Sequence, residues 1–204
     1  MKNVFVPTDN VARFTSAMRI LEDTKKGQPG LAVAYGRAGR GKTVAAIAWH
    51  AERGGFFLRV WQDWTQHAFL QALCFEVCGE RPHGAHLCKT KLCEALGRLD
   101  GQPRTIYVDE ADRLHPGRIE DLRDIHDVTG CPVVLIGEEQ LYPSMGGKRR
   151  IWSRVTQRVE FGPVKDEDVL VFAAQAADLR LTPEAASLVD RKSTRLNSSH
   201  GYIS

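Results

Sequence analysis

A glycine-rich octapeptide runs from Gly36 to Thr43, with the sequence GRAGRGKT. It matches the pattern G-x-x-x-x-G-K-[ST] at every fixed position, and it lies between an apolar segment and a helical one. Glycines let the backbone close around phosphate groups, whose charge is met by loop amides and a helix N-terminus. Lys42 is predicted to reach the β- and γ-phosphates of ATP, and the Thr43 hydroxyl to ligate Mg²⁺. The predicted nucleotide-binding segment comprises Gly36, Arg37, Ala38, Gly39, Arg40, Gly41, Lys42, Thr43 and Val44.

Two adjacent carboxylates, Asp109 and Glu110, follow the strand-like segment TIYV. Ligands of a parallel sheet bind at the carboxyl ends of its strands. These acids are therefore predicted to meet the phosphate loop there. We expect Asp109 to hold Mg²⁺ through its water shell, and Glu110 to orient and polarise the attacking water. The chemistry predicted for the pair is hydrolysis of ATP.

Short apolar runs alternate with amphipathic segments along most of the chain. Strands are expected over residues 31–36, 56–61, 104–110, 131–138 and 156–161, and helices over 10–24, 42–53, 65–78, 85–99, 117–129 and after Lys165. Thr182 and Pro183 are expected to begin a further helix. This alternation predicts an α/β fold in which a five-stranded parallel sheet lies between helices. The expected domains are a nucleotide-binding domain over 1–163 and the start of a helical lid, cut short, over 164–189.

Composition places the chain among ordinary globular proteins. Its 204 residues are 43% hydrophobic and 26% charged, which is typical of such domains. No segment approaches the roughly 18 uncharged apolar residues of a membrane helix. The N-terminus lacks the apolar core of a signal peptide. We expect a cytoplasmic protein.

The five cysteines are odd in number and have no framework spacing, so reduced thiols are expected. Zinc binding is an alternative, because several cysteines and histidines lie close together in the sequence. Against zinc, Cys74 and Cys78 lie in an apolar helical pattern and no CxxC pair is present. Buried free thiols are favoured over a zinc site built from Cys74, Cys78, His83, His86, Cys88 and Cys93.

The segment from Asp190 to His200, DRKSTRLNSSH, resembles the conceptual translation of a sequencing adapter. Residues 190–204 are accordingly expected to be a non-native tail, with the natural protein continuing beyond Val189. Most of the charged residues in this tail are basic, so it supplies most of the net charge of +3. The positive net charge is therefore no evidence for nucleic-acid binding. A prediction of such binding has to be based on local clusters of basic residues.

With its phosphate loop, its DEAD segment (residues 109–112) and its VVLIG strand, the sequence resembles the AAA+ ATPases. The motifs VDEADRL, LRDIHDVTGCPVVLIGEEQL and SRVTQRVEF resemble, more narrowly, the target-DNA-capture ATPases (the B subunit) of Mu-like transposable phages and related transposons. This resemblance implies ATP-dependent self-assembly on DNA without sequence preference, and delivery of that DNA to a transposase.

Further residues take roles from the resemblance. Arg154, in SRV, matches the position of an arginine finger, which completes the ATP site of a neighbouring subunit. Arg158 is the competitor, and a plain surface arginine before a strand is the alternative interpretation of Arg154. Most relatives have a polar γ-phosphate sensor at the end of the fourth strand. Here Glu138 is the nearest residue, and a surface acid is the favoured interpretation of it.

The run GGKRR, residues 146–150, is expected to be a glycine-hinged basic loop. Lys148, Arg149 and Arg150 are its predicted contacts to the DNA backbone, with a solvated charge cluster as the alternative. Trp61, Trp64 and Trp152 could stack on bases, although packing within the core or an interface is favoured for each.

Two other function classes stay open at the level of sequence. One is a different AAA+ machine, such as a helicase loader or a secretion-associated ATPase. The other is a signalling or defence NTPase that uses nucleotide as a switch. DNA-stimulated ATP hydrolysis distinguishes the transposition role from both.

Overall fold

The five strands form a single parallel sheet. In a computed structural model that describes residues 8–23, 30–99, 105–145, 149–177, 179–182, 184–186 and 188, they lie in the order β2-β3-β4-β1-β5. Their bounds are β1 Leu31–Tyr35, β2 Phe56–Arg59, β3 Ile106–Asp109, β4 Val133–Gly137 and β5 Val155–Glu160. Every strand pair is parallel. All carboxyl ends therefore meet at one edge, where the phosphate loop and the two acids emerge.

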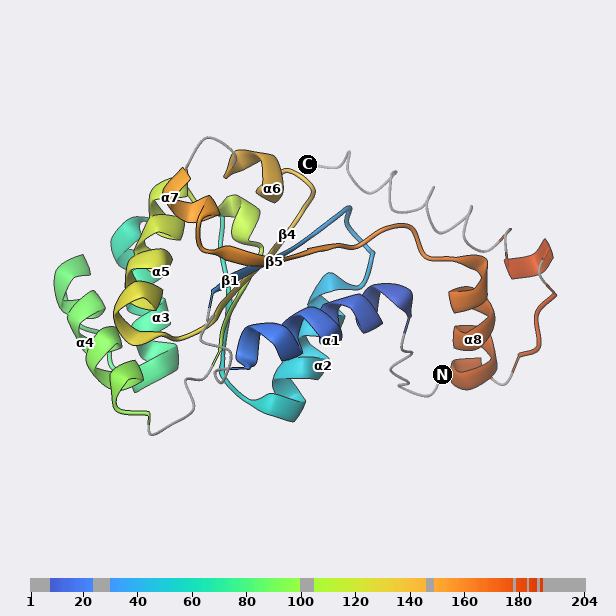
Figure 1. The fold of residues 1–204 in the computed structure, drawn as a ribbon, viewed down its shortest axis with the longest axis horizontal. Coiled ribbons are helices and arrows are strands. Elements are labelled where there is room, and N and C mark those ends of the chain that lie inside the picture. Colours follow the sequence, from blue (N-terminus) through green and yellow to red (C-terminus); the bar gives the residue numbers. More distant parts are fainter. Residues whose placement is uncertain are drawn as a thin grey trace.

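Helices cover both faces of this sheet (Figure 1). The helices α1 (Asp9–Glu22) and α2 (Lys42–Arg53) lie on one face, and α3 (Gln66–Cys78), α4 (Ala85–Gly97) and α5 (Pro116–Thr129) on the other. A short 3-10 helix, η2 (Ala111–Arg113), follows β3. Parallel strands buried on both faces explain the continuous apolar runs in the sequence.

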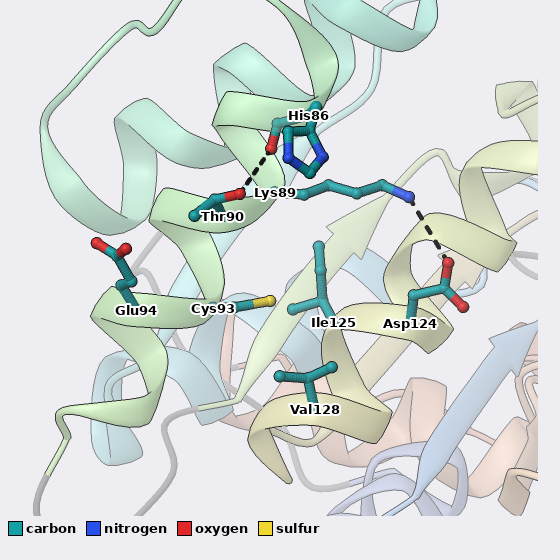
Figure 2. A pocket seen from close by; sticks show the side chains of 8 residues that line it. All are labelled: His86, Lys89, Thr90, Cys93, Glu94, Asp124, Ile125 and Val128. Atoms are coloured by element: carbon teal, nitrogen blue, oxygen red, sulfur yellow. Dashed lines mark hydrogen bonds and ion pairs between the residues drawn. The ribbon is translucent and has the colours of Figure 1, made fainter.

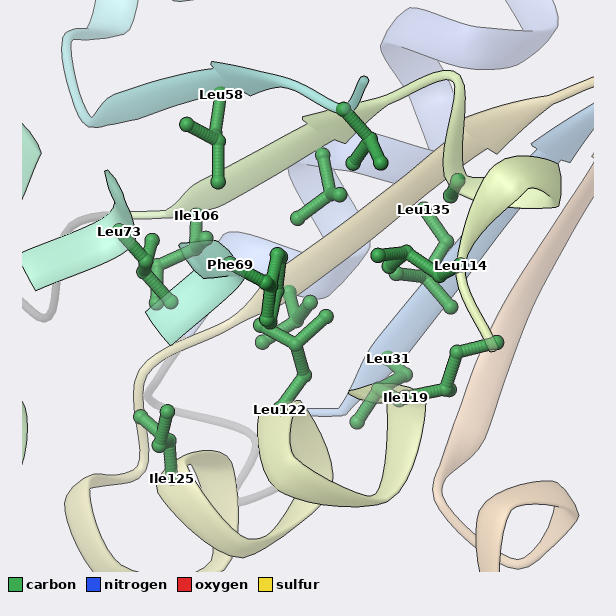
Figure 3. Packing of buried hydrophobic residues seen from close by; sticks show 14 of the residues in the cluster. Leu31, Leu58, Phe69, Leu73, Ile106, Leu114, Ile119, Leu122, Ile125 and Leu135 are labelled. Atoms are coloured by element: carbon green, nitrogen blue, oxygen red, sulfur yellow. The ribbon is translucent and has the colours of Figure 1, made fainter. Parts of the chain in front are cut away.

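Each face of the sheet has its own apolar core, because successive strand residues point to opposite sides. Ala32 and Ala34 face α1 and α2, where Phe14, Met18 and Trp49 fill the space above them. The opposite core is larger and brings together the inner faces of α3, α4 and α5. Figure 3 shows part of it, with Leu31, Leu58, Phe69, Leu73, Ile106, Leu114, Ile119, Leu122, Ile125 and Leu135 labelled.

Local sequence signals set several helix ends. Thr8 and Thr65 cap α1 and α3 by accepting hydrogen bonds from Val11 N and Ala68 N. Gly79 and Gly130 end α3 and α5 in the left-handed conformation that glycine adopts without strain. The helices and strands expected from the sequence accordingly lie within a few residues of their observed bounds.

Two short helices between β4 and β5 were not predicted. They are α6 (Leu141–Ser144) and α7 (Arg149–Trp152). The expectation of a basic loop over residues 146–150 is therefore wrong for Arg149 and Arg150, which begin α7. Residues 146–148, including Lys148, lie outside the described residues.

The chain turns away from the sheet after Phe161. An extended stretch leads to α8 (Asp166–Ala177), which stands apart from the sheet at the right of Figure 1. The Thr182 hydroxyl then accepts a hydrogen bond from Ala185 N, as an N-cap does. The tail over 190–204 lies outside the described residues. No helix in the described ranges has the length and apolar character needed to cross a membrane.

Candidate nucleotide site

The phosphate loop leaves β1 and enters α2 through residues with positive φ. Gly36, Gly39 and Gly41 have φ values of 148°, 75° and 85°, which side chains with a Cβ rarely adopt. At Gly36 an added Cβ would also press against the Phe161 carbonyl oxygen, whereas at Gly41 it would meet no other atom within 4 Å. The loop is thus packed on the sheet at its start and open where α2 begins. This is the geometry of a cradle for an anion at a helix N-terminus.

Lys42 folds over the loop that precedes it. Its Nζ donates hydrogen bonds of 2.8 Å to the carbonyl oxygens of Gly36 and Arg37. Burial lowers the pKa of Lys42, while four nearby acids raise it, with the Glu138 carboxylate having the largest effect among them. The ammonium group is therefore held at the loop and surrounded by negative charge, where it can meet a phosphate.

Asp109 is buried at the end of β3, and cations and donors surround it. The Thr43 hydroxyl donates to its two carboxylate oxygens at 3.0 and 3.2 Å. Arg59, at the end of β2, donates from Nε at 3.0 Å and from Nη2 at 2.9 Å to Oδ2. The carboxylate is only 2% exposed, and such a buried charge needs partners of this kind. Thr43 and Asp109 together present a hydroxyl and a carboxylate, the hard oxygen donors that Mg²⁺ prefers.

Glu110 has an unusual backbone. It is the sole non-glycine residue of the described chain with positive φ, at φ 58° and ψ 36°. This conformation costs of the order of 1 kcal/mol. It also turns the side chain out of the strand direction. Its Oε2 lies 3.2 Å from Arg113 Nη2. The carboxylate is thus partly exposed, close enough to the phosphate loop to act on the charge of Lys42, and is paired with a cation.

The last acid of the DEAD segment, Asp112, joins β3 to the end of β4. Its Oδ1 accepts a hydrogen bond of 2.9 Å from Glu138 N, and a Cβ at Gly137 would overlap this oxygen. Glycine is therefore required at Gly137 for the two strand ends to approach. The bond holds the backbone of Glu138 beside the site, where its negative charge raises the pKa of Lys42. The favoured interpretation of Glu138 as a surface acid fits its partial exposure, but its charge still acts on Lys42.

The arrangement at this edge of the sheet fits a nucleoside triphosphate and its magnesium ion. The loop offers an open cradle of amides, Lys42 a cation, and the Thr43–Asp109 pair a metal position. A family model described as an AAA domain matches residues 25–145, which include every part of this arrangement. The chain belongs to the AAA domain family.

This AAA domain is similar in sequence to phage transposition proteins. It is 30% identical over 178 residues to the "ATP-dependent target DNA activator B" of Escherichia phage Mu, covering 83% of the chain and 55% of that protein. It is 28% identical over 168 residues to the "Mu-like prophage FluMu DNA transposition protein B" of Haemophilus influenzae, covering 78% of the chain and 58% of that protein. The chain thus spans a little over half the length of these relatives. The resemblance to the Mu-like B subunit predicted from the motifs is confirmed.

Solved structures confirm the fold of the AAA domain. The ORC1 protein of Aeropyrum pernix, in complex with DNA, matches with a TM-score of 0.62 at 21% identity, covering 87% of this chain and 50% of that one. Cdc6p of Pyrobaculum aerophilum matches with a TM-score of 0.65 at 15% identity, covering 93% and 56%. The predicted α/β class with a five-stranded parallel sheet is therefore correct.

Arg154 lies at the edge of the AAA domain opposite the phosphate loop. Its carbonyl oxygen accepts a hydrogen bond of 2.8 Å from Leu31 N, where β1 begins, whereas the loop leaves the other end of β1. Five strand residues separate the two edges, or roughly 17 Å at 3.3 Å per residue. The guanidinium forms an ion pair with Asp127, with Nε 2.7 Å from Oδ1. Arg154 therefore cannot reach its own nucleotide site.

Arg158 occupies a different setting, among aromatic rings. Its guanidinium lies 4.9 Å from the centre of the Trp152 ring, and Nη1 lies 3.4 Å from Tyr142 Oη. Tyr142 in turn stacks on Tyr35, the residue before the phosphate loop, at 4.7 Å between ring centres. These contacts anchor Arg158 within its own subunit through packing and cation–π attraction.

The other candidate groups of the AAA domain do not join the nucleotide site. Arg149 and Arg150 are exposed on α7. Trp152 and Trp64 are partly buried against the larger apolar core, whereas Trp61 is 64% exposed and stacks on Trp64. Of the two favoured settings, the core and an interface, Trp61 therefore does not occupy the first.

The cysteines are free thiols, and in the described ranges no three side chains of His, Cys, Asp or Glu converge as a metal site. Burial raises the pKa of Cys74 and Cys131 to about 12 each. Both are therefore protonated and unreactive at neutral pH.

One further hollow of the AAA domain lies on the outer side of α4 and α5 (Figure 2). It has a volume of about 400 Å³ and is lined by His86, Lys89, Thr90, Cys93, Glu94, Asp124, Ile125 and Val128. Lys89 spans it with ion pairs to Asp121 and Asp124. None of its residues belongs to the nucleotide site, and its charged side chains Lys89, Asp124 and Glu94 are in ion pairs.

Sequence reasoning missed the charged partners of two candidate residues, Asp109 and Arg154. Arg59 stands opposite Asp109 in the register of β2 and β3, and Asp127 holds Arg154. Each lies far from its partner in the chain. A basic residue at a strand end, such as Arg59, does not indicate an ion pair until the strand register is known.

Proposed function

We propose that this chain binds ATP with Mg²⁺, hydrolyses it, and couples turnover to assembly on DNA in transposition. The single observation that supports the catalytic part is the contact between Thr43 and Asp109. It brings the metal-binding hydroxyl of the loop within 3.0 Å of the buried carboxylate of β3. This contact joins the two halves of the proposed ATP site.

The roles of the site residues follow from their places. Residues Gly36 to Val44 wrap the phosphates with backbone amides, and Lys42 exchanges its loop carbonyls for the β- and γ-phosphates. Thr43 and Asp109 hold the ion, which when bound neutralises charge on the phosphate oxygens. Glu110 accepts a hydrogen bond from water and orients it toward the γ-phosphate. Arg113, through its ion pair with Glu110, holds that carboxylate in position.

Assembly supplies the remaining charge. Because Arg154 lies at the opposite edge of the sheet, it can complete an ATP site only in a neighbouring subunit. When the Arg154 edge of one subunit contacts the nucleotide edge of the next, the interface is head-to-tail. Repeating such an interface forms rings or filaments. The proposal assigns Arg154 as the arginine finger. Arg158 is the weaker candidate, since aromatic contacts anchor it.

The DNA part of the proposal is supported by the relatives, whose names give target DNA activation and DNA transposition. We propose that Lys148, Arg149 and Arg150 contact DNA phosphates without sequence preference, and that the assembly delivers target DNA to a transposase. Arg149 and Arg150 are exposed and have no ion pair among the contacts of the described residues. Residues 164–189 are proposed to begin a helical lid.

The deciding experiment is an ATPase titration of the full chain with duplex DNA. Two duplexes of equal length and unrelated sequence should stimulate turnover equally, and turnover per subunit should rise with protein concentration. The Arg154→Ala variant should bind ATP normally and lose the stimulation. If the unmodified chain neither binds DNA nor responds to it, the transposition role is wrong, while the ATPase assignment is tested separately by its turnover without DNA.

A further inference from the structure

Hydrogen bonds fix the backbone of Arg154, whereas its side chain is partly exposed. Its N–H donates to the Ile151 carbonyl oxygen at 2.9 Å, and its carbonyl oxygen accepts from Leu31 N at 2.8 Å. An added Cβ at Gly30 would approach that same oxygen at 2.9 Å. The sheet therefore fixes where the side chain starts, but not where its guanidinium lies. An exposed arginine has considerable rotamer freedom, which is lost when it docks.

Asp127, near the end of α5, fixes the guanidinium. Nε of Arg154 lies 2.7 Å from Oδ1, and Nη2 lies 3.4 Å from Oδ2. This side-on fork uses the Nε edge of the planar group. Among the described residues no further partner contacts the outer edge, with Nη1 and the second proton of Nη2, and the Arg154 side chain is 46% exposed. The contact orients the cation without consuming the donors that a phosphate needs.

The groups around Asp127 favour the ionised carboxylate. The hydrogen bond from Arg154 is the largest cause that lowers the pKa of Asp127, and the nearby charges of His126 and Arg123 act in the same direction. Arg123 Nε lies 3.8 Å from Oδ2, too far for a hydrogen bond. Arg154 is therefore the main partner of Asp127, while Arg123 pairs more closely with Asp124.

We infer that Asp127 is a positioning residue for the arginine finger: its fork with Arg154 presents the free edge of the guanidinium to the ATP site of a second copy of this chain. This inference rests on the proposed role of Arg154. The alternative, a latch that withholds the finger, predicts the opposite effect. The contact with Asp127 leaves the outer edge of the Arg154 guanidinium exposed, which favours positioning. A latch would have to cover the N–H groups that bind the phosphate of the neighbouring subunit.

The test separates the subunit that gives the finger from the subunit that hydrolyses ATP. Recipient subunits carry Arg154→Ala and have an intact ATP site. Donor subunits carry Glu110→Gln, so that they bind ATP and assemble without hydrolysing it. When the two are mixed on duplex DNA with ATP, turnover arises at recipient sites completed by the donor's Arg154. Donors that also carry Asp127→Ala should restore much less turnover, by roughly tenfold, because misplacing a catalytic group is costly.

Two controls make the outcome specific. Donors with Asp124→Ala lose a neighbouring acid of α5 that has no contact with Arg154, and they should restore turnover fully. Thermal melting and nucleotide affinity of each donor check that it folds and binds ATP. Donors with Asp127→Glu, which keep a carboxylate, should restore more turnover than donors with Asp127→Ala.

The outcomes distinguish the two levels of the argument. If donors with Asp127→Ala restore turnover as well as, or better than, donors without it, the positioning role is wrong while the finger stands. If donors with Asp127 intact give no restoration, Arg154 is not the finger, and the role of Asp127 falls with it.

Discussion

Arg59 and Asp109 lie opposite each other in the register of β2 and β3, and the guanidinium donates two hydrogen bonds, of 3.0 and 2.9 Å, to one carboxylate oxygen. The carboxylate is buried, whereas the Arg59 side chain is 56% exposed. The Arg59 guanidinium therefore contacts the same carboxylate, that of Asp109, which is proposed to hold Mg²⁺.

Replacing Arg59 by Ala should destabilise the nucleotide-free chain by about 1–2 kcal/mol. A buried carboxylate that loses its partner is costly, and the exposure of Arg59 reduces the effect below that of a fully buried pair. Mg²⁺ with ATP should recover most of the loss, because the ion supplies the missing charge. Thermal melting with and without Mg²⁺-ATP measures both effects. An Arg113→Ala control removes a neighbouring arginine that does not contact Asp109; a loss of the same size in both variants would contradict the specific role of Arg59.

Replacing Lys42 by Ala should remove measurable ATP binding. Lys42 is the cation whose ammonium group is held over the phosphate loop, by the carbonyl oxygens of Gly36 and Arg37. The loss should appear in titrations with a fluorescent nucleotide. Arg37→Ala is the matched control, because Arg37 is exposed and pairs with Glu139 outside the loop. An affinity of the Lys42 variant near that of the unmodified chain would contradict the phosphate-loop assignment.

Replacing Glu110 by Gln should preserve ATP binding and lower turnover by about 10²-fold or more, because the amide keeps the shape but cannot polarise water as a carboxylate does. Single-turnover hydrolysis and nucleotide titration measure the two quantities. Asp112→Asn serves as the neighbouring control, since it should act through the strand end at Glu138 rather than on the water. Unchanged hydrolysis in the Glu110 variant would assign the water-activating role elsewhere.

Replacing Lys148, Arg149 and Arg150 by Ser should weaken DNA binding about equally on all sequences. Each lost phosphate contact should reduce the slope of log K against log salt by about 0.9. Turnover without DNA should persist, since Arg149 and Arg150 lie on α7 and do not join the nucleotide site. A variant with Arg81, Lys91 and Arg98 replaced removes the same charge near α4 and should leave the slope unchanged. Equal slopes for both variants would indicate a general charge effect in place of a contact site.

The sequence by itself determined the elements and the motifs of the ATP site. The phosphate loop and the Asp109–Glu110 pair are local patterns, and apolar runs that alternate with helical periodicity require a parallel sheet. The carboxyl ends of parallel strands meet at one edge, so the meeting of Thr43 with Asp109 could be expected before any coordinates. Local propensity also gave most helix ends, since capping residues act within a single turn.

Only the tertiary structure decided which charges meet. Arg59 and Asp109 are 50 residues apart in the chain, and Arg154 and Asp127 are 27 apart. Such pairs depend on strand register and on the angle at which α5 packs, and a shift of one residue would separate them. The short helices between β4 and β5 depend likewise on packing against the sheet and α5, because four residues are too few to form a helix from propensity alone. Long-range contacts of this kind placed Arg154 at the opposite edge from its own ATP site.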